Sequence, residues 1–180
     1  MSAVVVSVGR DSAHRFGKPP VGEITLLEGL GVEGDAHAGA TVQHLYDKKR
    51  HPDAPNLRQV HLMHSELFDE VAADGFTVTP GDLGENITTG GVDLLGLPAG
   101  TLLHLGETAV VELTGVRNPC RQINGVEPGL MKRLIRRGPD GEVERLSGVM
   151  SVVRTGGVVR AGDAIRVELP VGEPQPLQPV

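Results

Sequence analysis

Short aliphatic runs, each ended by glycine or proline within a few residues, constrain the fold of this chain more than any other feature. The 180 residues include 25 glycines and 13 prolines, whereas aromatic residues make up only 2% and tryptophan is absent. The core must therefore be built from valine, leucine and isoleucine. Short apolar runs between turn residues are typical of β-strands. Together they predict an all-β or β-dominated domain with many turns.

The aliphatic runs place predicted strands along almost the whole chain. In eight segments apolar residues alternate with polar ones or form valine-rich blocks. These predicted strands lie at 3–9, 21–28, 57–64, 92–97, 101–105, 108–114, 145–154 and 161–169. No internal repeat or change in composition marks a second domain, so we expect one domain over residues 1–169. The proline-rich residues 170–180 predict an extended or disordered tail.

Two segments are predicted to be helical instead. Residues 65–74 carry an apolar stripe, begin with Ser65 as a favourable N-cap and are followed by Gly75, a favourable helix end. Residues 127–137 have Pro128 in the first turn and basic residues towards the end, which suits the helix dipole. We interpret the first helix as structural, with a solvated charged face; the basic face of the second is either solvated or lines an anionic site.

Charge and cysteine content limit the classes of partner. Seventeen Lys and Arg residues against 23 Asp and Glu residues give a net charge of -6, so no nucleic acid partner is expected. This net charge does not exclude a local basic pocket for an anionic ligand. A single cysteine fits a reducing compartment. No signal peptide is evident, and no apolar stretch approaches the roughly 20 residues that span a bilayer. We therefore expect a cytoplasmic protein without a membrane partner, whose oligomeric state is left open.

The only cysteine, Cys120, lies in the segment Thr-Gly-Val-Arg-Asn-Pro-Cys-Arg-Gln-Ile at 114–123. It directly follows a predicted strand, and Asn118 and the next proline predict a turn there, where functional residues are common. Arg117 and Arg121 flank it, and nearby cations favour the reactive thiolate form. The alternative is a buried, inert cysteine. The surrounding arginines lead us to favour the functional interpretation.

Two further segments are rich in glycine. Residues 29–35 lack the Gly-Lys-Ser/Thr ending of a phosphate-binding P-loop, and a tight turn or bulge would explain their glycines equally well. Residues 79–91 offer backbone N–H groups and short polar side chains to a polar ligand. We interpret the carboxylates of that segment as turn and capping groups, and expect Asn86 and Thr88 to contact a ligand.

Basic residues and histidines gather in two loops. The loop 10–20 carries Arg10, His14, Arg15 and Lys18, and is either solvated or in contact with phosphate. The long excursion 36–56 carries histidines seven residues apart, at His37, His44 and His51. Glycine and prolines interrupt any continuous helix there, and no tight ligand pair completes a zinc site. We therefore interpret these histidines as non-metal, in an excursion that is either functional or mobile.

The predicted strand 57–64 carries further polar groups. Arg58 shares a face with apolar residues and ends either in a pocket or at the surface. His61 and His64 point to opposite faces of a strand, so they are not expected to chelate one ion.

Three of these segments, taken in order, resemble a known family. They are Gly31-Val-Glu-Gly-Asp35, Gly84-Glu-Asn-Ile-Thr88 and Arg117-Asn-Pro-Cys120. Over residues 3–169 the chain resembles a MOSC domain, which is named for the C-terminal part of molybdenum cofactor sulfurases. The stand-alone bacterial members are most similar, and the long insert before Arg58 departs from their pattern.

The resemblance implies a fold and a cofactor. The fold would be mainly β, a mostly antiparallel barrel with a few short helices, like the β-barrel domain of pyruvate kinase. The cofactor would be the pyranopterin molybdenum cofactor; pyridoxal phosphate is not expected. Cys120 would ligate molybdenum or carry sulfur. The residues implied to bind the cofactor are Arg58, Asn86, Thr88, Arg117, Asn118 and His37.

These implications leave several hypotheses on function. The protein could be an enzyme that reduces N-hydroxylated compounds, or one in which Cys120 carries a persulfide and transfers sulfur. It could instead be a carrier that binds the cofactor without turnover, or a barrel whose cysteine is merely packed. One cysteine and no flavin or dinucleotide motif means that electrons would come from a separate redox protein. Sulfur transfer would likewise need a separate sulfur-donor protein.

Overall fold

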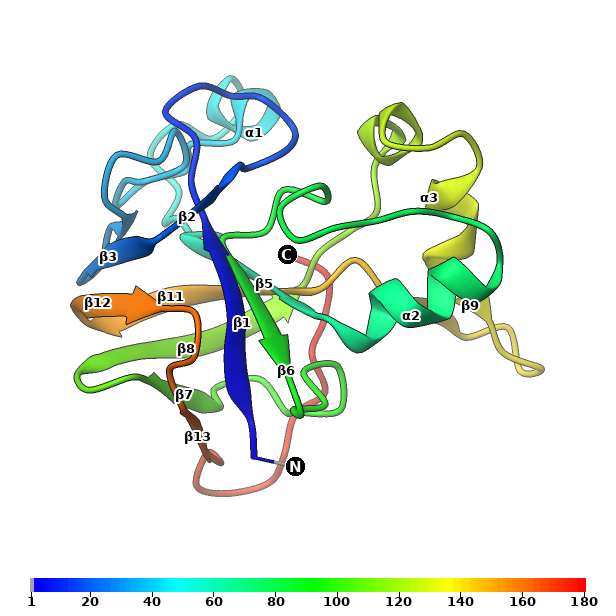
Figure 1. Cartoon of the computed structure of the whole chain (residues 1–180). Helices are drawn as coiled ribbons and strands as arrows, with labels where there is room; N and C mark the ends of the chain where they lie inside the picture. The colour runs from blue at the N-terminus through cyan, green and yellow to red at the C-terminus, as the bar shows by residue number, and fades with distance from the viewer. Residues whose placement is uncertain (1) are drawn as a thin grey trace.

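The protein folds around one strongly curled β-sheet, with short helices beside it (Figure 1). The computed structural model describes residues 2–180, apart from the side chains at positions 46 and 47. The strands are β1 (Val4–Gly9), β2 (Pro20–Val21), β3 (Glu23–Leu27), β4 (Gly31–Val32), β5 (Val60–His64), β6 (Ile87–Gly90), β7 (Leu102–Leu105), β8 (Ala109–Val116), β9 (Ile135–Arg137), β10 (Val143–Arg145), β11 (Val149–Thr155), β12 (Gly157–Arg160) and β13 (Ile165–Glu168). The helices are α1 (Leu45–Lys48), α2 (Glu66–Ala73), α3 (Leu130–Arg133) and the 3₁₀ helix η1 (Arg121–Gly125).

The main sheet has eight strands in the order β13-β7-β8-β11-β5-β6-β1-β2. Its pairs are antiparallel except β5 with β6. The sheet closes on itself between β1 and β13, because Val4 pairs with Ala164 and the Ile165 amide donates to the Ala3 carbonyl at 3.0 Å. The predicted mainly β, mostly antiparallel barrel is confirmed.

Two apolar clusters stabilise the fold. The first fills the barrel with valine, leucine and isoleucine side chains from nearly every strand. The second lies under α2, η1 and α3, which sit together on one side of the sheet (Figure 1). Strand β5 joins them, because Val60 and Leu62 face the barrel interior while Met63 faces the helices. As the sequence indicated, this alternation also puts His61 and His64 on opposite faces.

The predicted helix over 127–137 is wrong in its second half. The helix α3 spans only four residues, and Ile135–Arg137 forms strand β9, which pairs with β10. A tight turn between the two strands causes the difference: the Gly138 amide bonds the Glu142 carbonyl at 2.9 Å, and Gly141 has a φ of 81°. Pairing across this turn outweighs the helical periodicity of the segment.

Two other predicted strands also differ. Residues 92–97 form turns rather than a strand, because an Asp93 carboxylate oxygen accepts a hydrogen bond from the Gly96 amide at 3.1 Å. The segment predicted as one strand from 145 to 154 contains a break at Gly148, whose φ of 85° no extended strand allows. That break brings Ser147 and Gly148 against β5.

The proline-rich tail is extended, and it lies along the barrel. The Ala99 amide donates to the Gln175 carbonyl at 2.8 Å, and the Val116 amide donates to the Gln178 carbonyl at 2.9 Å. A side chain at Gly115 would collide with the tail, since an added Cβ would lie 2.2 Å from a methyl carbon of Val180. No helix among the described residues is long and apolar enough to cross a membrane.

Candidate functional site

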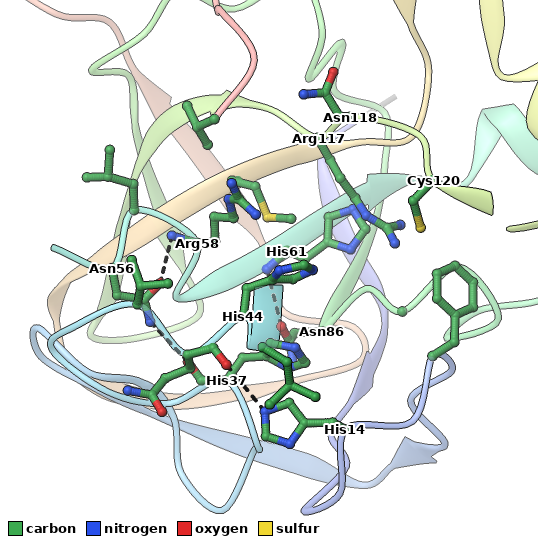
Figure 2. Close-up of a pocket in the computed structure, with 18 of the residues that line it drawn as sticks. His14, His37, His44, Asn56, Arg58, His61, Asn86, Arg117, Asn118 and Cys120 are labelled. Carbon is green, nitrogen blue, oxygen red and sulfur yellow. Dashed lines mark hydrogen bonds between the residues drawn. The ribbon is translucent and has the colours of Figure 1, made fainter. Parts of the chain in front are cut away.

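A cavity of about 780 Å³ opens between the barrel and its longest loops. Seven parts of the described chain line it: the loop 10–19, the excursion 36–56 with the residues just after it, strand β5, the turn 84–86, the cysteine turn after β8, Met150 of β11 and Val180 of the tail. Residues that are distant in sequence thus face one space, as Figure 2 shows for Cys120, His61 and His14. The long excursion forms part of the cavity wall.

The lining of this cavity is basic although the chain is acidic. Four cationic side chains and five histidines line it, and the described lining residues include no Asp or Glu. They are Arg15, Lys18, Arg58 and Arg117, with His14, His37, His44, His51 and His61. In a protein of net charge -6, such a concentration of positive charge attracts an anionic ligand.

The cysteine end of the cavity, formed by Arg117, Asn118 and Cys120, is positioned by β8. Directly after this strand, the Arg117 amide donates to the Gly148 carbonyl at 3.0 Å and its carbonyl accepts from the Ser147 hydroxyl at 2.8 Å. Cys120 is half-buried, faces the cavity and precedes η1 in an extended conformation. The Cys120 sulfur lies 3.6 Å from a Gln122 amide oxygen. The alternative of a cysteine sealed in the apolar core is therefore wrong.

Arg117 lies beside this thiol with its guanidinium fixed. It donates to the Leu83 carbonyl at 2.5 Å and lies 5.2 Å from the centre of the Phe16 ring. Burial lowers the pKa of Arg117, while the charges of Cys120 and Glu85 raise it in part. The side chain remains a cation, because a guanidinium stays charged in proteins. No ion pair with a carboxylate is found for Arg117 among the described residues. A half-buried cation of this kind is suited to an anionic group of a ligand.

The other flanking residues differ in position. Arg121 is exposed and does not line the cavity. Asn118 is exposed at the rim, and its side-chain oxygen accepts a hydrogen bond from Arg145 at 2.7 Å. Of the two arginines beside Cys120, only Arg117 thus shares the cavity with the thiol.

A buried carboxylate organises the opposite side. Asp35, whose side chain is 2% exposed, forms an ion pair with Lys18 and accepts hydrogen bonds from His37, at 2.9 Å from its amide and 3.2 Å from its Nδ1. Burial favours the protonated form of Asp35, but the His37 hydrogen bond and the Lys18 charge outweigh it and hold the pKa of the carboxyl below its usual range. An ionised carboxylate only accepts, so His37 carries its hydrogen on Nδ1 in this bond.

Asn86 connects this carboxylate to the barrel. Its amide nitrogen donates to the Gly9 carbonyl at 3.2 Å and to Asp35 at 3.1 Å, while its oxygen accepts from the His61 amide at 3.2 Å. Asn86 lines the cavity, but these bonds engage both ends of its side chain. Thr88 is buried and does not line the cavity, because its hydroxyl donates to Glu85 at 3.0 Å. The structure therefore does not bring Thr88 together with the other predicted site residues.

The carboxylates of the same segment act as the sequence predicted. Asp82 accepts from the amide and hydroxyl of Thr79, each at 2.8 Å, and Glu85 accepts from the Gly81 amide at 2.7 Å. Burial raises the pKa of Glu85, one of whose oxygens has no hydrogen-bond partner. These groups fix the turn that carries Asn86.

His61 lies at the back of the cavity between its two sides, and the sequence did not single it out as a site residue. Its Nε2 lies 2.8 Å from the Ser147 carbonyl, so Nε2 carries the hydrogen. Burial, with help from the Arg117 charge, lowers the pKa of His61 to about 3. The ring is therefore neutral, and it fits only because Gly148 has no side chain: an added Cβ would lie 2.8 Å from Nε2.

The remaining predicted residues share the cavity, and some were missed. Arg58 and His37 line it, as do Lys18 and His14 from the loop 10–20, for which contact with phosphate was one of two open interpretations. Asn56 was missed; it donates to the His37 carbonyl at 3.0 Å and shapes the excursion. No group of three His, Cys, Asp or Glu residues that could hold a metal ion occurs among the residues described.

A curled β-barrel with one thiol in a cation-lined cavity defines a candidate binder of an anionic cofactor. The sequence matches the MOSC domain over residues 35–166, and the chain belongs to this family, which is known for binding the molybdenum cofactor. No curated protein sequence matches it significantly.

Solved structures support the fold. The YuaD protein from Bacillus subtilis is 23% identical, with a TM-score of 0.72, over 93% of this chain and 96% of that one. YiiM from Escherichia coli is 23% identical, with a TM-score of 0.61, over 97% and 73%. YiiM from Geobacillus stearothermophilus is 18% identical, with a TM-score of 0.56, over 93% and 73%. At these identities the likeness concerns the fold alone.

Proposed function

We propose that this protein binds the pyranopterin molybdenum cofactor in its cavity, with Cys120 as the sulfur ligand of molybdenum. One observation carries the proposal: a half-buried thiol and four cationic side chains face a cavity whose described lining has no Asp or Glu, in a chain of net charge -6. A thiolate is a soft ligand that suits a soft metal centre. Guanidinium groups suit phosphate, which this cofactor carries.

The residues present fit the group in size and chemistry. The cavity volume of about 780 Å³ lies within the range of small-molecule sites, roughly 300–1,000 Å³. Arg117 and Arg58 would hold the anionic part, with Asn118 and His37 as hydrogen-bonding partners. Asn86 would act from behind the wall, because it holds Asp35 and the His61 backbone. Thr88 is left out, because it does not line the cavity.

Two reactions suit this arrangement in a reducing cytoplasm, where a single thiol stays reduced. The bound cofactor would supply two-electron redox chemistry. In the first reaction an N-hydroxylated compound is reduced, R–NH–OH + 2 e⁻ + 2 H⁺ → R–NH₂ + H₂O, with electrons from a separate redox protein. In the second, a Cys120 persulfide passes its outer sulfur to a nucleophilic acceptor, and Cys120 leaves as the thiolate.

A non-catalytic carrier is the second candidate. The observation that favours it is the single cysteine: the chain cannot hold an iron–sulfur cluster of its own. A carrier would need the same cavity and the same thiol, but no external electron donor.

The experiment is purification from a host that makes the cofactor, followed by measurement of molybdenum and oxidised pterin per protein. Wild type is compared with Cys120→Ala, and Arg117→Ala with the matched control Arg121→Ala, because both arginines flank the thiol but only Arg117 lines the cavity. A protein that is known to bind the cofactor, purified from the same host, checks the supply. Mass spectrometry tests Cys120 for one added sulfur atom.

The outcomes separate the candidates. Pterin that is retained in Cys120→Ala with loss of reductase activity supports a catalytic thiol, whereas added sulfur on Cys120 supports transfer. Normal loading without either activity or added sulfur favours the carrier. Absence of molybdenum and pterin from the wild type, with normal loading of the supply control, would overturn the proposal.

A further inference from the structure

The side of the cavity away from Cys120 is lined by imidazoles. Two histidines form this imidazole end, His14 and His37. Figure 2 shows His14 and His37 across the cavity from Arg117 and Cys120, with His61 between them. His37 belongs to the excursion 36–56 and His14 to the loop 10–19, so two loops build this end together, and His44 and His51 of the excursion also line the cavity.

The geometry of the imidazole end is partly fixed. Because His37 donates through Nδ1 to Asp35, its second ring nitrogen is left for a ligand. The His14 ring packs edge-on against the His37 ring, with centroids 5.2 Å apart, and its Nε2 lies 3.4 Å from the Gln43 carbonyl. Two imidazoles thus stand side by side at the cavity wall, held by groups that are already present.

The charges around these rings favour an anion. Arg15, Lys18 and Arg58 line the same cavity. Two of these cations are ion-paired, Arg15 with Asp11 and Lys18 with Asp35, and Asp35 also contacts His37. Further charged groups on the excursion, all exposed, are Lys48, Lys49, Arg50 and Asp53. The described lining includes no Asp or Glu side chain, so Arg58 and the imidazoles share a cavity without such a side chain.

We propose that the imidazole end is a subsite for a phosphate group, and that binding there tightens as the pH falls. This proposal rests on the proposed function and deepens it, since it adds a phosphate subsite with its own regulation to the anion contacts of Arg58 and Arg117. A protonated imidazole forms a charge-assisted hydrogen bond to a phosphate oxygen. A neutral imidazole whose unprotonated nitrogen faces the phosphate has no hydrogen to donate. Histidine ordinarily changes charge between pH 5 and 8, so ligand affinity and proton uptake are linked. The phosphate belongs either to the cofactor or to a phosphorylated substrate.

The test uses cofactor-free protein and sulfate, which stays a dianion between pH 8 and 5.5, so that any pH dependence comes from the protein. Isothermal titration calorimetry in buffers of different ionisation enthalpy gives both the affinity and the number of protons taken up. We expect sulfate to bind about tenfold more tightly at pH 5.5 than at pH 8, with uptake of about one proton, as one charge-assisted hydrogen bond predicts.

Variants assign the effect to the imidazoles. His14→Asn, at an exposed position that does not threaten folding, and His37→Asn, which keeps a donor towards Asp35, should each reduce the pH dependence to about twofold or less. The control is His104→Asn, because His104 lies away from the cavity and bonds Glu168; it should behave as wild type. Absence of sulfate binding, an affinity that does not depend on pH, or unchanged behaviour of both variants would overturn the subsite.

Repeating the titration with cofactor-loaded protein identifies the source of the phosphate. Loss of the pH-dependent sulfate site on loading means that the phosphate of the cofactor occupies it. Persistence of the site means that it serves a phosphorylated substrate. Because the first titration needs no cofactor, failure of the cofactor proposal and failure of this subsite are distinguishable.

Discussion

The two ends of the cavity are held by different forces. Arg117 and Cys120 follow directly on β8, whose backbone pairs with both β7 and β11, so the cysteine end takes its position from the sheet. The imidazole end rests on loops that converge on the buried Asp35. The comparison shows that the thiol takes its position mainly from backbone pairing, whereas the imidazoles on long loops depend on side-chain contacts, above all those of one buried carboxylate. Charge substitutions should therefore affect the two ends very differently.

The largest expected effect comes from Asp35→Asn, which should break the imidazole end. It leaves Lys18 buried without its carboxylate, and loss of one partner of a buried ion pair costs about 3 kcal/mol of unfolding free energy. Urea denaturation at pH 7 measures it. The matched control is Asp53→Asn on the exposed part of the excursion, with an expected change below about 0.5 kcal/mol. Equal effects of the two variants would contradict the central role of Asp35.

Arg117→Ala should weaken the cysteine end without unfolding the protein. A hydrogen bond to a charged group contributes about 1.5–3 kcal/mol, so cofactor content should fall about tenfold or more. Molybdenum and pterin per protein measure it, alongside Arg121→Ala, which should load as wild type. Normal loading of Arg117→Ala would show that the cysteine end does not bind the anionic part of the ligand.

His61 lies between the two ends, and we expect it to make the stability of the barrel depend on pH. Because the pKa of His61 is about 3 in the folded state against 6.5 ordinarily, the unfolded chain binds a proton in this range that the folded chain does not. Stability should therefore fall as the pH drops below about 6.5, by about 1.4 kcal/mol per unit. Urea denaturation at pH 7 and pH 5 should give a shallower fall for His61→Gln than for wild type, and an unchanged fall for His104→Gln. Parallel falls in all three proteins would refute a neutral, buried His61.

The smallest effect is expected for Gly115→Ala, which sharpens the comparison at the cysteine end. The added Cβ meets the Gln178 carbonyl oxygen at 2.3 Å, so the tail must leave β8 while the sheet stays paired. We expect faster proteolysis within 170–180 and a loss of about 1 kcal/mol or less. Gly22→Ala is the control, since nothing lies within 4 Å of its added Cβ. Equal resistance of residues 170–180 to proteolysis in both variants would show that the contact with Gly115 does not hold the tail.

The same division explains what the sequence could predict. The barrel and the cysteine turn follow from local signals, namely alternation along β8 and the break at Asn118 and Pro119. The bond between Lys18 and Asp35 could not be predicted, because it joins two loops whose paths depend on the whole fold. Thr88 was misjudged for a related reason: its motif was recognised, but strand alternation turned its hydroxyl towards Glu85. His61 had a strand signal, yet its neutrality depends on burial and on the charge of Arg117, which only the complete fold brings near it.

The seam between Val4 and Ala164 has a consequence for how the protein is made. Strand β1 can pair with β2 and β6 early, but the contact with Ala164 that closes the barrel has to wait until almost the whole chain has left the ribosome. Pairings between such distant residues form slowly, and an unsealed strand edge attracts other chains in the meantime. Nascent chains should therefore be most prone to aggregate just before synthesis ends, and a fused N-terminal partner would meet this newly forming join.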